Sequence, residues 1–326
     1  MRLSNLVPAI PANIVASLDA IGVRTEIDLL FSGSTFEIYN RLPANTLTLR
    51  ELTEYTALAA ELCAAPGTTA QEALRLEKEA LTGDDELRSG LEELDELLRG
   101  LGSGKVIEIS GDKGSGKTTL ALNIILHHLA SQPTPGTAVW VDTTGDFSSE
   151  KALNILACRQ LDENILERVQ VVLAFDIDFA QALLEDLSSR HDRGLRFLVI
   201  DTITPLLGPL FSAVSAQGHA IMTDFMRQLQ AFARKLGVTV FVINNTSGHG
   251  LEDNKRKPAL GPSFVLLTDT SLWLQAILDT SAETDDPILH SLQIVKSRSK
   301  PTGCSMTFCV RDSTVSPVLV ENNPRS

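Results

Sequence analysis

The segment from Gly111 to Thr118 reads Gly-Asp-Lys-Gly-Ser-Gly-Lys-Thr and matches the pattern GxxxxGK[ST] at every fixed position. The apolar run 106–110 precedes it, and the stretch 120–129, with apolar residues at helical spacing, follows it. In such a strand–loop–helix, glycines let consecutive backbone N–H groups curl around phosphate oxygens, and the helix N-terminus adds the positive end of its dipole. The segment therefore predicts a nucleotide-phosphate loop rather than a glycine-rich turn without chemical use.

Specific side chains of this loop have expected roles in binding ATP. Lys117 would neutralise the β- and γ-phosphates, and the Thr118 hydroxyl would be a ligand of Mg²⁺. A carboxylate near Thr118 is also needed, and the apolar strand 197–200 ends in Asp201. By itself this is a buried strand with a polar end, but its place in the chain order favours the Mg²⁺ role. The predicted ATP-binding residues are Gly111, Asp112, Lys113, Gly114, Ser115, Gly116, Lys117, Thr118 and Thr119.

Short apolar runs and helix-length segments alternate from about residue 90 onward. The runs are 106–110, 138–142, 168–172, 196–201 and 238–244, and the helix-length segments are 117–130, 148–160, 178–190 and 218–236. Nearly continuous Val- and Ile-rich runs are typical of strands buried on both faces, so this alternation predicts a doubly wound α/β domain. After residue 262 three β-like runs follow without helices, at 271–278, 288–296 and 304–310, and predict a β-hairpin extension at one sheet edge.

The pattern along the chain predicts two domains, as its length also does at roughly 150 residues per domain. Residues 1–65 have apolar positions at helical spacing, interrupted by a turn at Gly22, and predict a small all-helical domain. Residues 66–87 are expected to be a linker, because acidic residues and turn formers replace the apolar pattern there. The ATPase domain is expected over 88–320, followed by a tail at 321–326.

Composition limits the classes of partner. The chain has 326 residues and a net charge of −13, so contact with nucleic acid requires a local basic patch rather than a global field. No apolar run approaches the roughly 18 residues of a membrane span, and no membrane partner is expected. His127 and His128 are expected at surface or helix-cap positions rather than as metal ligands. Free thiols in a reducing, intracellular compartment are expected for all four cysteines, Cys63, Cys158, Cys304 and Cys309.

Several segments in fixed order resemble one family, the RecA-like recombinases. They are Gly90-Leu91, Leu94-Asp95, Leu98, Gly100, Gly104, Glu108, the phosphate loop, 139–145, Asp201-Thr202 and 242–245. More specific segments, 168–172, 174–177, 257–261 and 300–303, resemble the eukaryotic recombinase paralogues, and most closely the D-type paralogue. The resemblance covers about residues 88–311. It implies a RecA-like P-loop core, and the N-terminal region is similar in kind to that family's helix-hairpin-helix-like domain.

The resemblance also implies a function. Members of this kind are nuclear, ATP- and Mg²⁺-dependent mediators of DNA double-strand break repair by homologous recombination. They act in a hetero-oligomer with other RecA-like paralogues, bind single-stranded DNA weakly and assist the main strand-exchange recombinase, including at stalled forks and in meiotic recombination. The alternative is an autonomous DNA-dependent ATPase of the RecA class. A small-molecule P-loop kinase is disfavoured, because no Arg cluster follows the central strands.

One position departs from the pattern of active RecA-like ATPases. The family's glutamate that positions the attacking water is replaced here by Thr144. A threonine cannot accept a proton at neutral pH, so a general-base contribution of about 10²–10⁴-fold should be missing. We expect a chain that binds ATP but hydrolyses it weakly and slowly, unless a partner, Asp142 or Asp146 supplies the missing group.

Two later segments resemble functional parts of the family. Asn245 occupies the place of a γ-phosphate-sensing residue, so the resemblance makes it a catalytic candidate beside Lys117 and Asp201; the alternative is a polar strand end that caps a loop. The segment 246–257 occupies the place of the second DNA-binding loop. Its cations Lys255, Arg256 and Lys257 can contact phosphates, but no aromatic residue is present for base stacking.

The basic segment 296–301 lies where related filaments cover the ATP of a neighbour, and a solvated hairpin connection is an equal alternative. The family's aromatic-xx-Ala polymerisation hook is not evident around 55–58. The resemblance therefore favours pairing with unlike subunits over self-filamentation.

Overall fold

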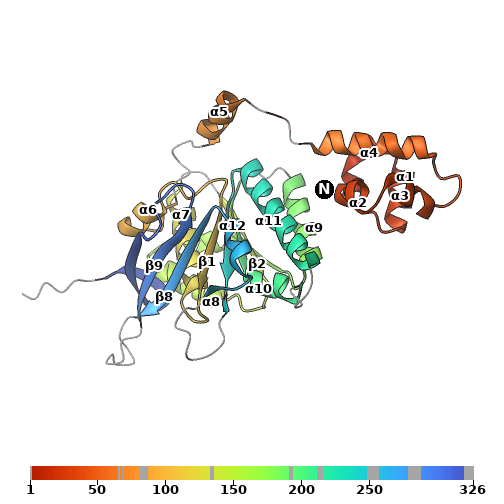
Figure 1. Ribbon diagram of the computed structural model, residues 1–326. Coiled ribbons are helices and arrows are strands. Elements are labelled where there is room, and N and C mark those ends of the chain that lie inside the picture. The colour runs from red at the N-terminus through yellow and green to blue at the C-terminus, as the bar shows by residue number, and fades with distance from the viewer. Residues whose placement is uncertain are drawn as a thin grey trace, which may run out of the picture. The chain divides into compact units, whose positions relative to one another are not determined.

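The computed structural model describes residues 2–64, 67, 69–80, 87–132, 136–190, 194–210, 216–247, 257–277 and 288–318 (Figure 1). The chain divides into two compact units, Met1–Arg75 and Leu76–Ser326, which are described separately. Within the segment predicted as a linker lies a helix, α5 (Ala70–Ala80), and the division between the units falls inside it. The predicted tail at 321–326 lies outside the described residues.

The first unit is helical. Its elements are η1 (Leu3–Leu6), α1 (Ala12–Ala20), α2 (Glu26–Phe31), α3 (Thr35–Arg41) and α4 (Leu49–Cys63). Reciprocal capping boxes start three of these helices, with the N-cap and N3 pairs Thr25 and Asp28, Ser34 and Glu37, and Thr48 and Glu51. Such caps satisfy N–H groups that the first turn leaves without partners. Leu18, Leu29 and Leu52, each at most 1% exposed, contribute to a core of their own.

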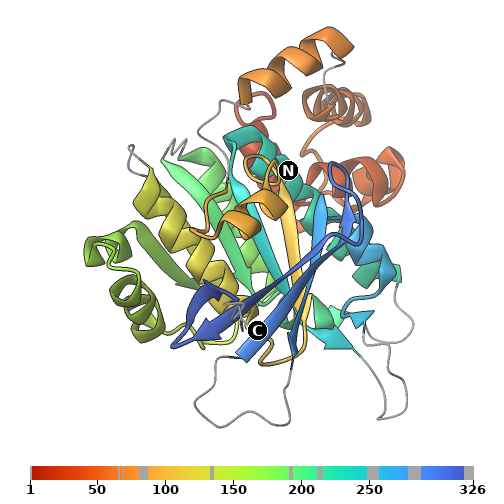
Figure 2. The ribbon, with the colours of Figure 1, turned by 90° about the vertical axis from the view of Figure 1, so that its left-hand side faces the viewer.

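Among the residues described in the second unit, nine strands form one sheet, in the order β11-β10-β9-β8-β1-β5-β4-β2-β3. The strands are β1 (Val106–Gly111), β2 (Thr137–Asp142), β3 (Val169–Leu173), β4 (Leu195–Asp201), β5 (Thr239–Asn244), β8 (Thr270–Ile277), β9 (Ile288–Ser297), β10 (Ser305–Arg311) and β11 (Thr314–Pro317). The pairs from β8 through β1 to β3 are parallel, and those from β8 to β11 are antiparallel. Figure 2 shows the blue C-terminal strands continuing the sheet beyond β1.

Helices cover both faces of this sheet (Figure 1). One face packs against α6 (Glu92–Leu98), α7 (Lys117–Ser131), α8 (Ser149–Cys158) and η2 (Glu163–Arg168). The other packs against α9 (Ile177–Ser189), α10 (Ile203–Leu207), α11 (Ala216–Leu236) and α12 (Pro262–Leu266), while η3 (Gly208–Leu210) follows α10. Successive residues of a strand point to opposite faces, so Val199 joins the first core and Leu198 the second.

The predicted fold class is confirmed: a mainly parallel sheet with helices on both faces and an antiparallel C-terminal extension. Two details differ. The run 168–172 was expected to be buried on both faces, but β3 is an edge strand, and its Val171 and Leu173 are 42% and 52% exposed. The extension also has a further strand, β11, and a separate two-stranded pair is formed by β6 (Thr246–Ser247) and β7 (Lys257–Pro258).

Within the described ranges, no helix combines the length and the apolar character needed to cross a lipid bilayer. All four cysteines are free, as expected.

His128 differs from its expected surface or cap position, since it is 5% exposed. Its ring packs edge-on against Phe197 of β4, with centroids 5.0 Å apart, and the Arg88 N–H donates to Nδ1 at 3.4 Å. Burial lowers the pKa of His128 to about 4, and the positive charges of Arg196 and Arg88 act in the same direction. The ring is therefore held neutral in the folded state.

This depressed pKa predicts a loss of stability in mild acid. In the unfolded chain His128 is protonated below about pH 6.5, whereas in the folded protein it is protonated only below about pH 4. The free energy of unfolding therefore falls as the pH is lowered from 6.5 to 4. At about pH 5 the expected contribution of His128 is a loss of about 2 kcal/mol relative to neutral pH. Urea unfolding at both pH values should show this loss, and His128→Gln should remove most of it. Equal losses in both proteins would contradict the assignment.

Candidate nucleotide-binding site

The predicted phosphate loop joins β1 to α7 at the carboxyl end of the central parallel strands, as the sequence predicts. Gly114 and Gly116 have φ angles of +81° and +89°, which side chains with a Cβ rarely adopt. At Gly111 the requirement is space, because a Cβ there would lie 2.2 Å from the carbonyl oxygen of Leu274 in β8. The backbone therefore needs glycine at each of these positions of the motif.

Lys117 is the first residue of α7 and is 6% exposed. Its Nζ donates to the carbonyl oxygens of Gly111 at 2.9 Å and Asp112 at 2.7 Å, so the ammonium group lies over the loop. Burial lowers the pKa of Lys117, while the charges of Asp201 and Asp112 oppose this effect. A phosphate bound in the loop would supply a countercharge where burial disfavours the bare cation.

Thr118 and Asp201 meet directly. Thr118 Oγ1 donates to Asp201 Oδ2 at 2.8 Å, which joins the start of α7 to the end of β4. Burial raises the pKa of Asp201 to about 6; the hydrogen bond from Thr118 opposes this shift and the negative charge of Asp142 adds to it. A cation beside this carboxylate would favour its charged form.

The donor atoms of this pair suit Mg²⁺, which prefers oxygen ligands and is commonly held by one or two protein groups together with phosphates and water. Among the described residues, no cluster of three or more His, Cys, Asp or Glu side chains is placed to hold a metal ion by itself. Thr118 and Asp201 would thus hold Mg²⁺ only together with the phosphates of a nucleotide. The remaining residues of the predicted ATP-binding set lie in the same loop and first turn, with Lys113 exposed.

The neighbouring strand β2 ends beside β4, with Asp142 opposite Asp201. Asp142 is 3% exposed, and its two carboxylate oxygens accept backbone N–H groups of Thr144 at 3.0 Å, Gly145 at 2.8 Å and Phe147 at 2.9 Å. Burial alone would raise the pKa of Asp142, but these hydrogen bonds outweigh it and lower the pKa. The carboxylate of Asp142 therefore holds the backbone of residues 144–147 in place.

Thr144, at the position of the expected glutamate, is exposed, and its hydroxyl donates to Asp142 Oδ1 at 3.3 Å. Asp146 is also exposed. Of the three residues considered for activating water, Thr144 has no basic group and Asp142 is fully used by the backbone. The side chain of Asp146 is exposed, so its carboxylate is available to activate water.

Beyond β5, the polar residues Asn244 and Asn245 have different environments. Asn244 is fully buried: its Nδ2 donates to Glu108 Oε1 at 2.8 Å, and its Oδ1 accepts from Thr204 Oγ1 at 3.1 Å. Asn245 is half-buried, and its backbone carbonyl accepts from Ala259 N at 2.7 Å. Since Ser110 lies opposite Asn244 in the sheet, Asn245 comes level with Gly111, near the start of the phosphate loop.

The predicted DNA-binding loop leaves the site directly after Asn245. Thr246 Oγ1 donates to Asp112 Oδ1 of the phosphate loop at 2.7 Å, and β6 and β7 pair at the base of the loop. Of the three predicted cations, Lys257 is exposed at the start of β7, and Lys255 and Arg256 lie outside the described residues. One end of this segment is therefore hydrogen-bonded to the phosphate loop.

The cations of 296–300 contact other parts of the ATPase unit. Lys296 Nζ donates to the Val265 carbonyl at 2.8 Å, and Arg298 lies 3.3 Å from the carboxylate of Asp269. Lys300 Nζ donates to the Glu96 carbonyl at 2.8 Å. Arg298 and Ser299 are exposed at the start of the connection from β9 to β10, so the hairpin-connection alternative describes this part of the segment, while Lys296 and Lys300 are half-buried.

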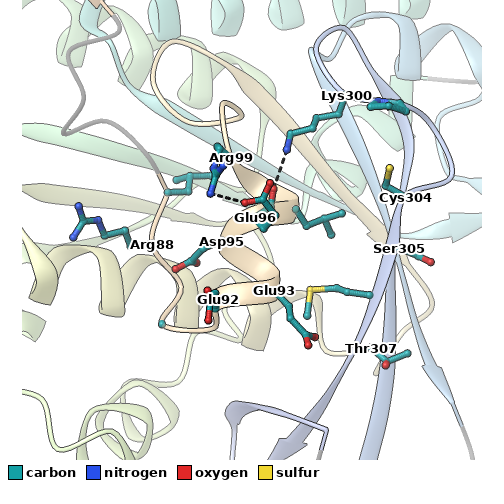
Figure 3. A pocket seen from close by; sticks show the side chains of 15 residues that line it. Arg88, Glu92, Glu93, Asp95, Glu96, Arg99, Lys300, Cys304, Ser305 and Thr307 are labelled. Atoms are coloured by element: carbon teal, nitrogen blue, oxygen red, sulfur yellow. Dashed lines mark hydrogen bonds and ion pairs between the residues drawn. The ribbon is translucent and has the colours of Figure 1, made fainter.

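An open hollow of about 1270 Å³ lies between α6 and the start of β10. Figure 3 shows Lys300 and Arg99 both reaching Glu96, with Ser305 and Thr307 on the opposite wall. Acidic and basic side chains are mixed along it, and it contains no residue of the predicted ATP site. The side chains with predicted roles in ATP binding lie together at the phosphate loop instead.

Two contacts of the phosphate loop were missed from the sequence. Thr246 is predicted only as part of the DNA-binding segment 246–257, and His290 of β9 has no predicted role, although a Cβ on Gly116 would lie 3.2 Å from its Cε1. Neither residue belongs to a short motif, and each is more than a hundred positions away from the loop. Only the pairing order of the sheet brings them there.

Comparisons with known proteins agree with this architecture. The Rad51 family profile matches residues 85–274. The chain is 30% identical to "DNA repair protein RAD51 homolog 4" of Bos taurus, over 93% of each chain, and 31% identical to the Mus musculus protein of the same name, over 70% of this chain and 71% of the other. The crystal structure of the RadB recombinase superposes with a TM-score of 0.59 at 24% identity, covering 71% of this chain and 99% of that one.

The role of Asp142 predicts a specific pattern of damage. Asp142→Ala removes the acceptor of three backbone N–H groups, and because Thr144 and Gly145 are exposed and can bond to water instead, the free energy of unfolding should fall by about 1 kcal/mol. Asp142→Asn keeps one oxygen acceptor and should lose less. Urea unfolding of the two variants measures this order, and amide exchange at Gly145 should be fastest in Asp142→Ala. An Asp142→Ala protein with unchanged stability would show that the carboxylate does not hold the loop.

Proposed function

The chain belongs to the Rad51 family, and on this premise we propose that it is an ATP- and Mg²⁺-binding, RecA-like protein that acts in homologous-recombination repair of DNA. The observation that carries the proposal is the meeting of Thr118 and Asp201 at 2.8 Å beside Lys117. The loop would bind the phosphates through its N–H groups, and Lys117 would neutralise them. Bound Mg²⁺, held by Thr118 and Asp201, would offset negative charge on the phosphates.

We further propose that this protein binds ATP firmly and hydrolyses it slowly. In support, Thr144 offers no group that accepts a proton at neutral pH, and the carboxylate of Asp142 is occupied by backbone N–H groups. Lys117, Asp201 and Asn245 would then bind and sense the phosphates more than they drive turnover. ATP would act mainly as a stabilising ligand of an assembled state.

The proposed cellular role is that of a mediator subunit, of the D-type among the recombinase paralogues. The relatives named RAD51 homolog 4 support this assignment, since the alignment with one of them covers 93% of both chains. We propose that the protein works in the nucleus, in a hetero-oligomer with other RecA-like paralogues, and assists the main strand-exchange recombinase at breaks, at stalled forks and in meiosis. The absence of a recognisable polymerisation hook around 55–58 favours unlike partners.

Single-stranded DNA is the proposed nucleic-acid ligand, bound weakly by the segment that carries Lys255, Arg256 and Lys257. These three adjacent cations form a local positive charge in a chain whose net charge is −13. The hydrogen bond from Thr246 to Asp112 joins the beginning of this segment to the phosphate loop. DNA binding and nucleotide binding would therefore be linked.

The hydrolysis proposal is tested by steady-state ATP turnover with and without single-stranded DNA. Wild-type turnover should be barely measurable while Lys117-dependent ATP binding is retained, and Thr144→Glu should raise turnover by about tenfold or more, because it restores a group that can accept a proton. Asp146→Asn tests the remaining exposed carboxylate of this loop: unchanged turnover would exclude Asp146 as the base, and loss of turnover would assign the base to Asp146. Brisk DNA-stimulated turnover of the wild type would favour the alternative, an autonomous DNA-dependent ATPase.

The DNA proposal is tested by the salt dependence of single-strand binding. Three phosphate contacts predict that log K falls with log salt with a slope of about −2, or about 15-fold between about 50 and 200 mM salt. Changing Lys255, Arg256 and Lys257 to Ala should remove most of the binding and flatten the slope. The charge-matched control replaces three exposed, ion-paired arginines elsewhere, Arg50, Arg99 and Arg190. A triple variant that binds as the wild type does would refute this role.

A further inference from the structure

Thr143, which directly follows β2, makes three hydrogen bonds to the backbone of Asp201 and Thr202. It is 4% exposed. Its N–H donates to the Asp201 carbonyl at 3.0 Å, its Oγ1 accepts the Thr202 N–H at 2.9 Å, and its hydroxyl donates to the Thr202 carbonyl at 2.7 Å. Thr143 therefore binds both polar atoms of the peptide group between Asp201 and Thr202.

These bonds extend the pairing of two parallel strands beyond their ends. Asp142 lies opposite Asp201 in the sheet, so Thr143 comes level with Thr202, where β4 has ended and α10 begins. Thr202 is the N-cap of α10, but its hydroxyl makes no capping bond, and its buried Oγ1 has no partner among the described residues. The side chain of Thr143 thus supplies hydrogen bonds at a place where that of Thr202 supplies none.

The proposed Mg²⁺ ligand Asp201 is thereby held at both ends. Thr118 donates to its carboxylate at 2.8 Å, and Thr143 binds its backbone. Only one carbon separates the carboxylate from the backbone, so a rotation of this peptide group would move the carboxylate with it. A ligand group has to stay within about 0.5 Å of its working position. The bonds made by Thr143 therefore help to determine where the carboxylate lies.

We propose that Thr143 is a positioning residue for the Mg²⁺ site: it fixes the peptide group after Asp201 and so holds the Asp201 carboxylate beside Thr118. This inference rests on the proposed binding of ATP and Mg²⁺. It gives Thr143 a role different from that of its neighbour Asp142, whose carboxylate binds the backbone of the following loop. It also makes the end of β2 part of the support of the metal site.

A purely structural role would be to satisfy buried backbone groups, and a matched pair of variants separates the two roles. Thr143→Ser keeps the hydroxyl, whereas Thr143→Val keeps the shape of the side chain without it. Calorimetric titration of the full-length chain with ATP, with and without Mg²⁺, measures the gain in affinity that Mg²⁺ provides. This gain should be about 2- to 10-fold smaller in Thr143→Val than in Thr143→Ser, the size of effect of one hydrogen bond. The affinity for metal-free ATP should be the same in both.

Amide exchange at Thr202 without nucleotide or metal gives a second readout, because this N–H donates to the Thr143 hydroxyl. Exchange should be faster in Thr143→Val than in Thr143→Ser, since only the valine variant lacks the acceptor. If Thr143→Val does not fold, Thr143→Ala takes its place. It differs from Thr143→Ser by the hydroxyl alone, and the same differences in Mg²⁺ gain and in exchange are expected.

An equal Mg²⁺ gain in the Ser and Val variants would overturn the role of Thr143. So would a Val variant that loses as much affinity for metal-free ATP as for MgATP, because that result would indicate general damage to the site. A wild-type protein that shows no Mg²⁺ gain would instead refute the proposed function. In that case exchange at Thr202 still decides whether Thr143 holds this peptide group, and equal exchange in the two variants would reject that as well.

Discussion

Thr118 and Asp201 are 83 positions apart in the chain, yet their oxygens lie 2.8 Å apart, and the candidate site depends on this contact. It exists because β1 and β4 run parallel on either side of β5, so that their carboxyl ends open at one edge of the sheet. Ligands of open parallel sheets bind at that edge. The same edge receives Asp142 from β2 and Asn245 from β5, and the chemistry of the protein is concentrated there.

Much of this arrangement could be predicted from the sequence. Buried parallel strands have long Val- and Ile-rich runs, and the backbone of the phosphate loop requires glycine at fixed positions. What could not be predicted depends on tertiary neighbours. Val171 and Leu173 lie in a run typical of a central strand, but β3 is the edge strand, and no strand of the described part of the chain pairs with its outer side. His128 was expected near the surface, and packing against Phe197 buries it.

The site residues divide in the same way. The phosphate loop and Asp201 could be identified because their local pattern is fixed by the ligand. The hydrogen bonds from backbone N–H groups to the Asp142 carboxylate could not be predicted, because a carboxylate at the end of a strand has the same sequence pattern whether it binds backbone or activates water. His290 had no signature at all, since its position behind Gly116 depends on how β8 and β9 add to the sheet.

The central claim is that Thr118 and Asp201 bind ATP together with Mg²⁺. The most direct measurement is calorimetric titration of the full-length chain with ATP, with and without Mg²⁺, for the wild type and Asp201→Asn. Mg²⁺ should tighten ATP binding by the wild type about tenfold or more, and Asp201→Asn should lose most of that gain while still binding metal-free ATP. An ATP affinity that is independent of Mg²⁺, or a Mg²⁺ effect that survives in Asp201→Asn, would contradict the claim.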